Sequence, residues 1–187
     1  MDALAACVDR VRGEALAIAL GANLPGPAGE PLDTLIAVRP LIADLLEGWA
    51  SQVVQVRWSP LYRTAPAGGP VGQPDYLNAV LLVSRVGPPR LDRALGLLEQ
   101  LQQLEQHFGR VRVERWGPRC LDLDLLWWAG FQCDLPSLTL PHPFWRERGF
   151  VLAPLQALMC GQRGEEVFNT RVPDLPTPLP GRPGWPE

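Results

Sequence analysis

Residues 120–128 read Cys-Leu-Asp-Leu-Asp-Leu-Leu-Trp-Trp, and this alternation of apolar and acidic side chains predicts a β-strand. Side chains in a strand point to opposite faces in turn, so the leucines would enter a core while Asp122 and Asp124 share the other face. Two neighbouring carboxylates repel each other unless a cation lies between them. The pattern leaves two alternatives open, a magnesium site or a solvent-facing strand with two ordinary acids.

The segments that precede this strand show further regular patterns. They predict strands at 15–20, 53–61 and 76–83 and helices at 31–46 and 91–108. We expect Pro40 to kink or split the first helix, and Pro60 to place the end of the second strand at a sheet edge. The order is βαββαβ, which indicates an α+β, ferredoxin-like fold with helices packed on a mostly antiparallel sheet.

The chain has 187 residues, of which 47% are hydrophobic, enough for one domain with a packed core. We expect this domain at 15–160, after an N-terminal extension at 1–14 that includes a short helix. A tail rich in Pro and Gly, residues 161–187, is expected to pack poorly. The N-terminus does not resemble a signal peptide, no apolar run approaches the about 20 residues of a bilayer span, and the four cysteines are scattered. These features predict a cytoplasmic protein with reduced thiols.

The charged residues limit the possible functions. The formal net charge is −3, which argues against general nucleic-acid binding, and all 17 basic residues are arginine. A P-loop requires a lysine, so that class of phosphate site is excluded. Because the net charge is negative, any phosphate site must be local. Arginine favours planar, bidentate contacts with anions.

A cluster of arginines precedes the acidic pair. Residues 109–119 read GRVRVERWGPR, with four arginines in ten positions. Arginines beside a carboxylate–metal site suit a polyphosphate, and the glycines at both ends would let the segment move as a lid. In isolation such a segment is more typical of a solvated charged loop. Its position next to Asp122 and Asp124 favours phosphate binding.

Two further groups are weaker on their own. Tyr76 and Asn78 point the same way at the start of a predicted strand, where a ring and an amide suit the face and edge of a heterocycle. A core tyrosine and a capping asparagine are the more usual interpretation of such a pair. His142, within Leu-Pro-His-Pro, is by itself more typical of a structural histidine.

Together and in this order, these groups resemble the 6-hydroxymethyl-7,8-dihydropterin pyrophosphokinases. The matching segments are AIALGANL at 17–24, YRTAP at 62–66, QPDYLNAV at 73–80, GRVRVERWGPRCLDLDLL at 109–126, LPHP at 140–143 and RGFVLAPL at 148–155. The resemblance spans about residues 15–158. It implies a ferredoxin-like fold and the transfer of diphosphate from ATP to the hydroxymethyl group of a reduced pterin, with release of AMP, in folate biosynthesis.

The resemblance also implies roles for single residues. Asp122 and Asp124 would be catalytic and hold two Mg²⁺ ions that bridge the phosphates of ATP, with Arg110 and Arg119 as further catalytic residues. Other ATP contacts would come from the long helix, the lid and the region around His142, namely Gln102, Glu105, Arg112, Arg115, Trp116, Leu125, Thr139, His142 and Arg148. The pterin would be bound between two rings, at its edge by an amide and along a loop, by Tyr76, Phe150, Asn78, Thr64, Pro66 and Ala67.

Some positions depart from the family pattern. Ala22 stands where serine is usual, Ala65 and Ala67 are smaller than usual, and Pro143 stands where an aromatic residue is sometimes present; these affect local contacts rather than the reaction. Two rival hypotheses remain, a non-catalytic binding module on the same fold and an ATP-dependent transferase with another acceptor. The expected partners are ATP and a reduced pterin, with neither nucleic acid nor membrane, and the protein is expected to be a monomer.

Overall fold

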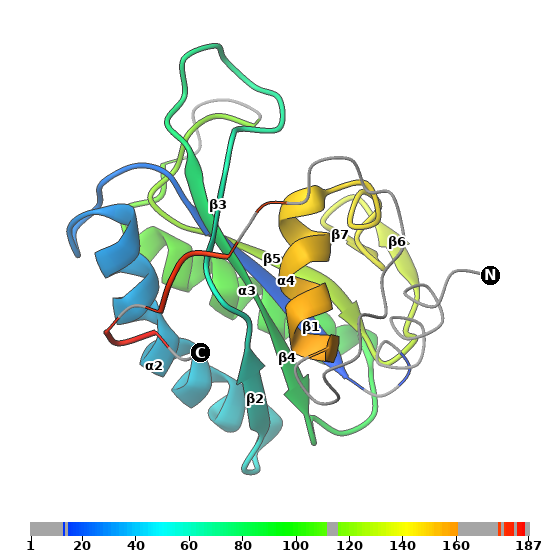
Figure 1. Ribbon diagram of the computed structural model, residues 1–187. Helices are drawn as coiled ribbons and strands as arrows, with labels where there is room; N and C mark the ends of the chain where they lie inside the picture. The colour runs from blue at the N-terminus through cyan, green and yellow to red at the C-terminus, as the bar shows by residue number, and fades with distance from the viewer. Residues whose placement is uncertain are drawn as a thin grey trace.

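The computed structural model describes residues 13, 15–111, 116–160, 176, 178–181 and 183–185. Its centre is a five-stranded sheet in the order β2–β4–β1–β5, in which β3 also pairs with β4 and every pairing is antiparallel (Figure 1). The strands are β1 (Leu16–Ala22), β2 (Gln55–Trp58), β3 (Tyr62–Thr64), β4 (Tyr76–Ser84) and β5 (Asp122–Trp128). With the helices α2 (Pro31–Ala50) and α3 (Leu91–His107), they confirm the predicted ferredoxin-like order.

Helices cover both faces of the sheet, and β1 shows why. All seven of its residues are buried, as expected for a continuous apolar run at the sheet centre. Leu16, Ile18 and Leu20 belong to the core formed with α2 and α3. Ala17 and Ala19 belong to a second, smaller core formed with α4 (Gly149–Cys160) on the opposite face.

Pro40 was expected to kink or split α2; the split does not occur, because the helix continues through Pro40. Pro40 is exposed, whereas Leu35, Val38, Ile42 and Leu46 are buried on the sheet side of both halves. A proline inside a helix costs about 3 kcal/mol, while each buried aliphatic side chain contributes about 1.5–3 kcal/mol. Packing against the sheet therefore outweighs the missing backbone hydrogen bond.

The strand predicted at 53–61 is shorter and is followed by a separate strand. β2 ends at Trp58, and β3 begins at Tyr62 after a break at Ser59 and Pro60. Ser59 keeps contact with β4 across the break, because its N–H donates to the Val80 carbonyl at 2.9 Å and its Oγ accepts the Val80 N–H at 3.0 Å. β2 is an edge strand, as Pro60 predicted.

Three elements were not predicted. A hairpin of β6 (Cys133–Leu135) and β7 (Leu138–Leu140) follows β5, and α4 follows the hairpin. The α4 sequence is apolar on all sides and contains Pro154, so it lacks the one-sided stripe that marks a surface helix. The tail was expected to pack poorly, and its described residues 178, 180, 181, 183 and 184 are exposed; Trp185 is the exception, because it is 6% exposed and belongs to the larger core.

Some predictions fall on undescribed residues. Apart from Gly13, the helix expected in the N-terminal extension lies outside the described residues, as do residues 161–175 of the tail. Within the described part of the chain, no helix combines the length and apolar character needed to cross a bilayer.

Candidate active site

The sheet face that carries α4 is only half covered by it. Val80, Leu82 and Leu126 pack against α4. Further along the same face, Asn78 and Asp124 instead line an open cavity of about 420 Å³. The alternation along β5 is therefore confirmed: its first leucines enter the larger core and its acids face the cavity.

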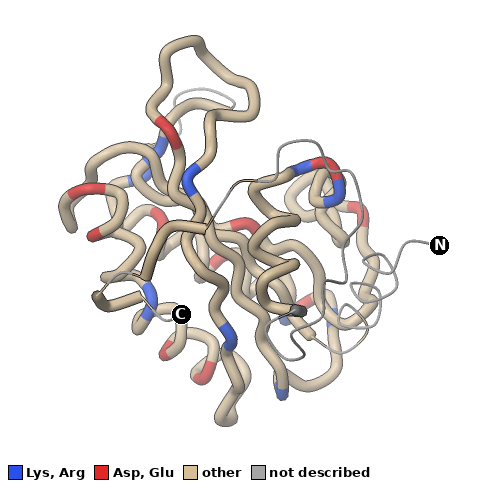
Figure 2. Tube along the Cα trace, in the orientation of Figure 1, with Lys and Arg blue, Asp and Glu red and all other residues tan. Residues whose placement is uncertain are grey.

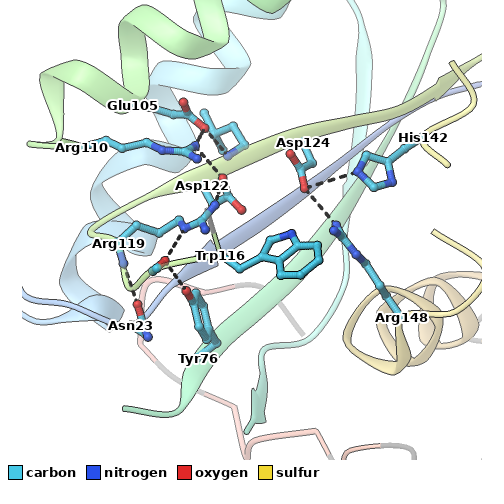
Figure 3. A network of polar contacts seen from close by, with 12 residues as sticks. Asn23, Tyr76, Glu105, Arg110, Trp116, Arg119, Asp122, Asp124, His142 and Arg148 are labelled. Atoms are coloured by element: carbon cyan, nitrogen blue, oxygen red, sulfur yellow. Dashed lines mark hydrogen bonds and ion pairs between the residues drawn. The ribbon is translucent and has the colours of Figure 1, made fainter. Parts of the chain in front are cut away.

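Arginines hold both acids of β5 (Figure 3). Asp122 pairs with Arg119, whose Nη1 lies 3.0 Å from Oδ1, and with Arg110. Asp124 accepts a hydrogen bond from Arg148 Nη1 at 3.2 Å. Both acids come from β5. Arg110 and Arg119 lie before this strand, and Arg148 lies directly before α4. The fold therefore brings together charges that are up to 38 positions apart in the sequence, from Arg110 to Arg148.

A third carboxylate, from α3, contacts the backbone of β5. Glu105 of α3 is 2% exposed and accepts the Leu123 N–H at 2.7 Å. Its carboxylate also pairs with Arg110, which thereby bridges Glu105 and Asp122. A buried carboxylate needs such partners, because an unpaired charge would cost several kcal/mol.

The Asp124 carboxyl is held in an unfavourable electrostatic state. Burial at the floor of the cavity, together with the charge of Asp122, raises its pKa to about 6. The neighbouring guanidinium of Arg148 acts in the opposite direction and only partly compensates. A cation between the two acids would relieve both the burial of charge and the repulsion.

The same carboxyl faces a neutral histidine. Burial and the positive charge of Arg148 lower the pKa of His142 to about 4. The Phe144 N–H donates to Nδ1 of His142 at 3.2 Å, so Nδ1 is an acceptor and the proton lies on Nε2. Nε2 lies 4.0 Å from Asp124 Oδ2. His142 therefore presents an N–H donor to the cavity.

The acids fit a magnesium site. They offer two oxygen donors side by side, and the cavity beside them has space for water and phosphate. Among the described residues, no three His, Cys, Asp or Glu side chains gather into a cage for a metal ion. Magnesium commonly binds through one or two carboxylates together with waters and substrate phosphates, and needs no such cage.

Next to this charged end, the cavity has a neutral end whose side chains are already hydrogen-bonded. Asn78 is 5% exposed, and its Nδ2 donates to Thr64 Oγ1 at 2.8 Å. The Tyr76 hydroxyl donates at 3.1 Å to the Gly117 carbonyl, which also accepts the Arg119 Nε–H at 3.0 Å, so the two ends meet at this carbonyl. Gly21 allows this arrangement, because a Cβ there would lie 2.8 Å from Asn78 Oδ1.

Comparison with known proteins identifies the family. The model of the 7,8-dihydro-6-hydroxymethylpterin-pyrophosphokinase (HPPK) family matches residues 17–160. The chain belongs to this family. It is 40% identical over 139 residues to a 2-amino-4-hydroxy-6-hydroxymethyldihydropteridine pyrophosphokinase of Synechocystis, a match that covers 74% of this chain and 63% of the relative. Enzymes of the same name from Haemophilus influenzae and Pseudomonas aeruginosa are 39% and 40% identical, over 74% and 75% of this chain and 77% and 78% of theirs.

As a member of the HPPK family, the chain is an enzyme, a pyrophosphokinase of folate biosynthesis that acts on a reduced pterin. Acidic and basic positions are interspersed along the trace rather than gathered on one basic face (Figure 2). Charged side chains, among them Asp122, Asp124 and Arg148, line the cavity.

The cavity brings together most of the site residues predicted from the sequence. They come from the sheet, α3, the segment between α3 and β5, the hairpin and the region around the start of α4: Thr64, Ala67, Tyr76, Asn78, Gln102, Glu105, Arg110, Trp116, Arg119, Asp122, Asp124, Leu125, Thr139, His142, Arg148 and Phe150. Pro66 lies between two lining residues but is not part of the lining itself. Arg112 and Arg115 lie outside the described residues.

Sequence reasoning missed several contributors, including residues 135–138 of the hairpin. Phe144 lines the cavity beside Arg148. The Arg148 guanidinium lies 5.9 Å from the centroid of the Phe144 ring and 5.4 Å from that of the Phe150 ring. Leu98 lines the cavity from α3, one turn before Gln102. Asn23, 2% exposed, accepts the Arg119 N–H at 2.8 Å and donates to the Pro74 carbonyl at 3.1 Å. The available sequence signal for Asn23 was an amide side chain placed directly after an apolar strand.

Proposed function

We propose that the charged end of the cavity binds ATP with two Mg²⁺ ions held by Asp122 and Asp124, and that the neutral end binds 6-hydroxymethyl-7,8-dihydropterin. One observation carries this assignment: a pair of acids, surrounded by arginines, shares a continuous cavity with Tyr76 and Asn78. Bound magnesium would neutralise phosphate charge and make the pterin hydroxyl easier to deprotonate.

The arginines have a second role in this proposal. Without ligand, three carboxylates (Glu105, Asp122 and Asp124) are balanced by three guanidiniums (Arg110, Arg119 and Arg148). When cations bind the two aspartates, Arg119 and Arg148 can instead donate hydrogen bonds to nearby phosphate oxygens. Arginine is well suited to this exchange, since its planar fork binds carboxylate and phosphate alike.

The open edge of β5 is suited to the adenine. β5 is an edge strand, and the Leu123 N–H already points away from β1 toward Glu105. Alternate residues present their backbone groups to the same edge, so the N–H and C=O of Leu125 lie on that side too. Gln102 and Thr139 line the cavity on either side of this edge. Together these groups would bind the edge of a purine.

The neutral end is suited to a pterin. Asn78 uses one N–H on Thr64, which leaves a second N–H and the Oδ1 atom for the donor and acceptor groups of a pterin edge. Tyr76 and Phe150 both line the cavity and offer rings for the two faces of the heterocycle. Ala67 would extend the contact along the loop after β3.

In the reaction, the pterin hydroxyl oxygen attacks the β-phosphorus of ATP in line. The new bond joins that oxygen to the β-phosphorus, and the bond between the β-phosphorus and the oxygen bridging to the α-phosphorus breaks, which releases AMP, while the hydroxyl proton passes to solvent. His142 is not placed to take the proton through Nε2, because that nitrogen already carries one. His142 and the arginines would donate to phosphate oxygens, so the residues act mainly by positioning and charge stabilisation.

We also propose that the protein acts as a monomer in the cytoplasm. One chain supplies every group assigned above to the two substrates. The described cysteines Cys120 and Cys133 are free thiols, which is typical of a reducing compartment.

The test is an assay for AMP formation from ATP. We expect AMP release to require both 6-hydroxymethyl-7,8-dihydropterin and magnesium, with equal amounts of AMP and pterin diphosphate. Release of AMP without pterin, or equal turnover with a structurally unrelated hydroxymethyl acceptor, would contradict the assignment of the acceptor. Full turnover in excess chelator would contradict the role of the metal.

A further inference from the structure

The described C-terminal residues cross the edge of the sheet instead of leaving the domain. We use the term C-terminal strap for residues 178–181 and 183–185, which reach the side of α2 (Figure 1). Trp185, near the end of the strap, is as buried as many residues of the core to which it belongs. The strap is therefore part of the folded domain, and its contacts show what it holds in place.

One end of the strap is anchored by Trp185. Its Nε1–H donates to the Ser59 carbonyl at 2.9 Å, and its ring lies edge-on to Trp58 with the ring centroids 5.6 Å apart. The Arg39 guanidinium lies 5.1 Å from the centroids of both rings and donates to the Gly184 carbonyl. These contacts attach the strap to α2 and to the end of β2.

The other end of the strap pairs with β3. The Leu179 N–H donates to the Leu61 carbonyl at 2.7 Å, and Pro178 forms an antiparallel bridge with Tyr62. β3 has three residues, and β4 pairs with it on one side. The strap thus acts as a short extra strand on the side that β4 leaves open.

β3 leads directly to the pterin end of the cavity. Thr64, its last residue, pairs with Tyr76 in β4 and accepts the hydrogen bond from Asn78. The strap contacts Ser59 and Leu61, which lie just before β3. It therefore holds the segment that determines where Thr64 stands.

We propose that the C-terminal strap is a positioning element for the pterin end of the cavity. It keeps β3 against β4 and so sets the affinity for the reduced pterin, while the nucleotide end, built on α3, β5 and the hairpin, is unaffected. The hydrogen bonds and ring contacts of the strap described above go to α2, to β2 and β3, and to the residues between these two strands. This inference rests on the proposed function, because it assumes that Thr64 and Asn78 bind the pterin.

The test uses three full-length variants. Leu179→Pro removes the N–H donated to Leu61, Trp185→Ala removes the ring and its N–H, and Trp185→Phe keeps a ring without the N–H. Nucleotide affinity is measured with α,β-methylene-ATP and Mg²⁺, and pterin affinity with 6-hydroxymethylpterin added to protein saturated with that analogue. We expect the pterin Kd to rise about tenfold for Trp185→Ala and about fivefold for Leu179→Pro, and Trp185→Phe to retain part of the affinity. The nucleotide Kd should change by less than about twofold.

Ile42→Val is the matched control for a general loss of stability. Ile42 is fully buried on the same helix that the strap contacts, and the loss of one methyl group should lower the melting temperature without changing either Kd. The inference is overturned if the strap variants leave the pterin Kd at the parental value, or if they weaken both ligands equally. If Trp185→Ala does not fold, Leu179→Pro and Trp185→Phe still decide the question.

Asn78→Ala distinguishes a failure of the strap inference from a failure of the proposed pterin pocket. If it weakens pterin binding while the strap variants do not, the strap inference is wrong and the proposed pocket stands. If it also leaves the pterin Kd unchanged, the assignment of the pterin end is wrong, and with it the proposed function of this part of the cavity.

Discussion

The two ends of the cavity are built in opposite ways. At the charged end, Asp122 and Asp124 are paired with arginines that would have to give way if a metal and a triphosphate bind as proposed. At the neutral end, Asn78, Thr64 and Tyr76 already make their hydrogen bonds within the fold. One end therefore exchanges partners on binding, and the other is formed in advance. Preorganisation lowers the cost of binding a small neutral ligand, whereas a highly charged ligand can compensate for rearrangement.

The largest expected effect is the loss of activity when only the charged end of the cavity is changed. Asp122→Ala and Asp124→Ala should each lower kcat by about a thousandfold or more, because the phosphate charge is no longer stabilised in the transition state. The pterin Kd should stay near the parental value, since the neutral end is intact. Steady-state kinetics together with pterin titration measure both quantities. Turnover by either variant at nearly the parental rate would show that the acids are ordinary surface residues.

A smaller effect should follow from breaking the neutral end. In Gly21→Ala, the new Cβ would lie 2.8 Å from Asn78 Oδ1 and 3.6 Å from Tyr76 Cδ1, so Asn78 must move. We expect the pterin Kd to rise about tenfold, roughly the loss of one good hydrogen bond, with little change in nucleotide Kd. Gly96→Ala on α3 is the matched control, because a Cβ there meets nothing within 4 Å. Equal pterin affinity in the two variants would contradict the preorganised pocket.

The smallest expected effect concerns pH. Burial and Asp122 raise the pKa of Asp124 to about 6, above its usual 3.8, so this group stabilises the free protein below about pH 4 and that contribution is lost as pH rises through 6. The pKa of His142 is lowered from 6.5 to about 4, so its contribution is present above pH 6.5 and is lost as pH falls through 4. The two contributions oppose each other between about pH 4 and 6.5.

Magnesium distinguishes them, because a metal requires the ionised form of Asp124. The rise in melting temperature caused by α,β-methylene-ATP with Mg²⁺ should therefore grow from pH 5 to pH 7.5, as measured by thermal unfolding. His142→Asn should keep this trend, because the asparagine removes the titrating histidine and leaves Asp124 in place. A shift that is independent of pH in the parental protein would contradict the raised pKa of Asp124.

β1 and β4 were predicted as continuous apolar runs, whereas β5 and α3 were predicted from a single buried face. In β5, strict alternation separates the leucines of the core from Asp122 and Asp124, so both the strand and its functional face follow from the pattern. α3 is predicted almost to its ends for the same reason, since Ala94, Leu97 and Leu101 form one buried stripe. Burial on one side leaves a period in the sequence, and the period reveals the element.

The elements that escape prediction lack such a period. α4 packs within an apolar cluster and is hydrophobic around its whole circumference, while the strap depends on two aromatic rings and one backbone pairing among prolines and glycines. His142 and Arg148 were found only through the family resemblance, because their partner Asp124 lies about twenty positions earlier in the chain. Such long-range charge contacts leave no local signal in the sequence.

The central claim is that Asp122 and Asp124 hold the metal ions that accompany the triphosphate, and a titration with Mn²⁺ as a spectroscopic substitute tests it most directly. With saturating α,β-methylene-ATP, electron paramagnetic resonance should detect two Mn²⁺ ions bound per chain in the parental protein. The Asp122→Asn and Asp124→Asn variants should lose tight binding of this pair, while the neutral end still binds pterin. Two Mn²⁺ ions bound with unchanged affinity in both variants would contradict the account.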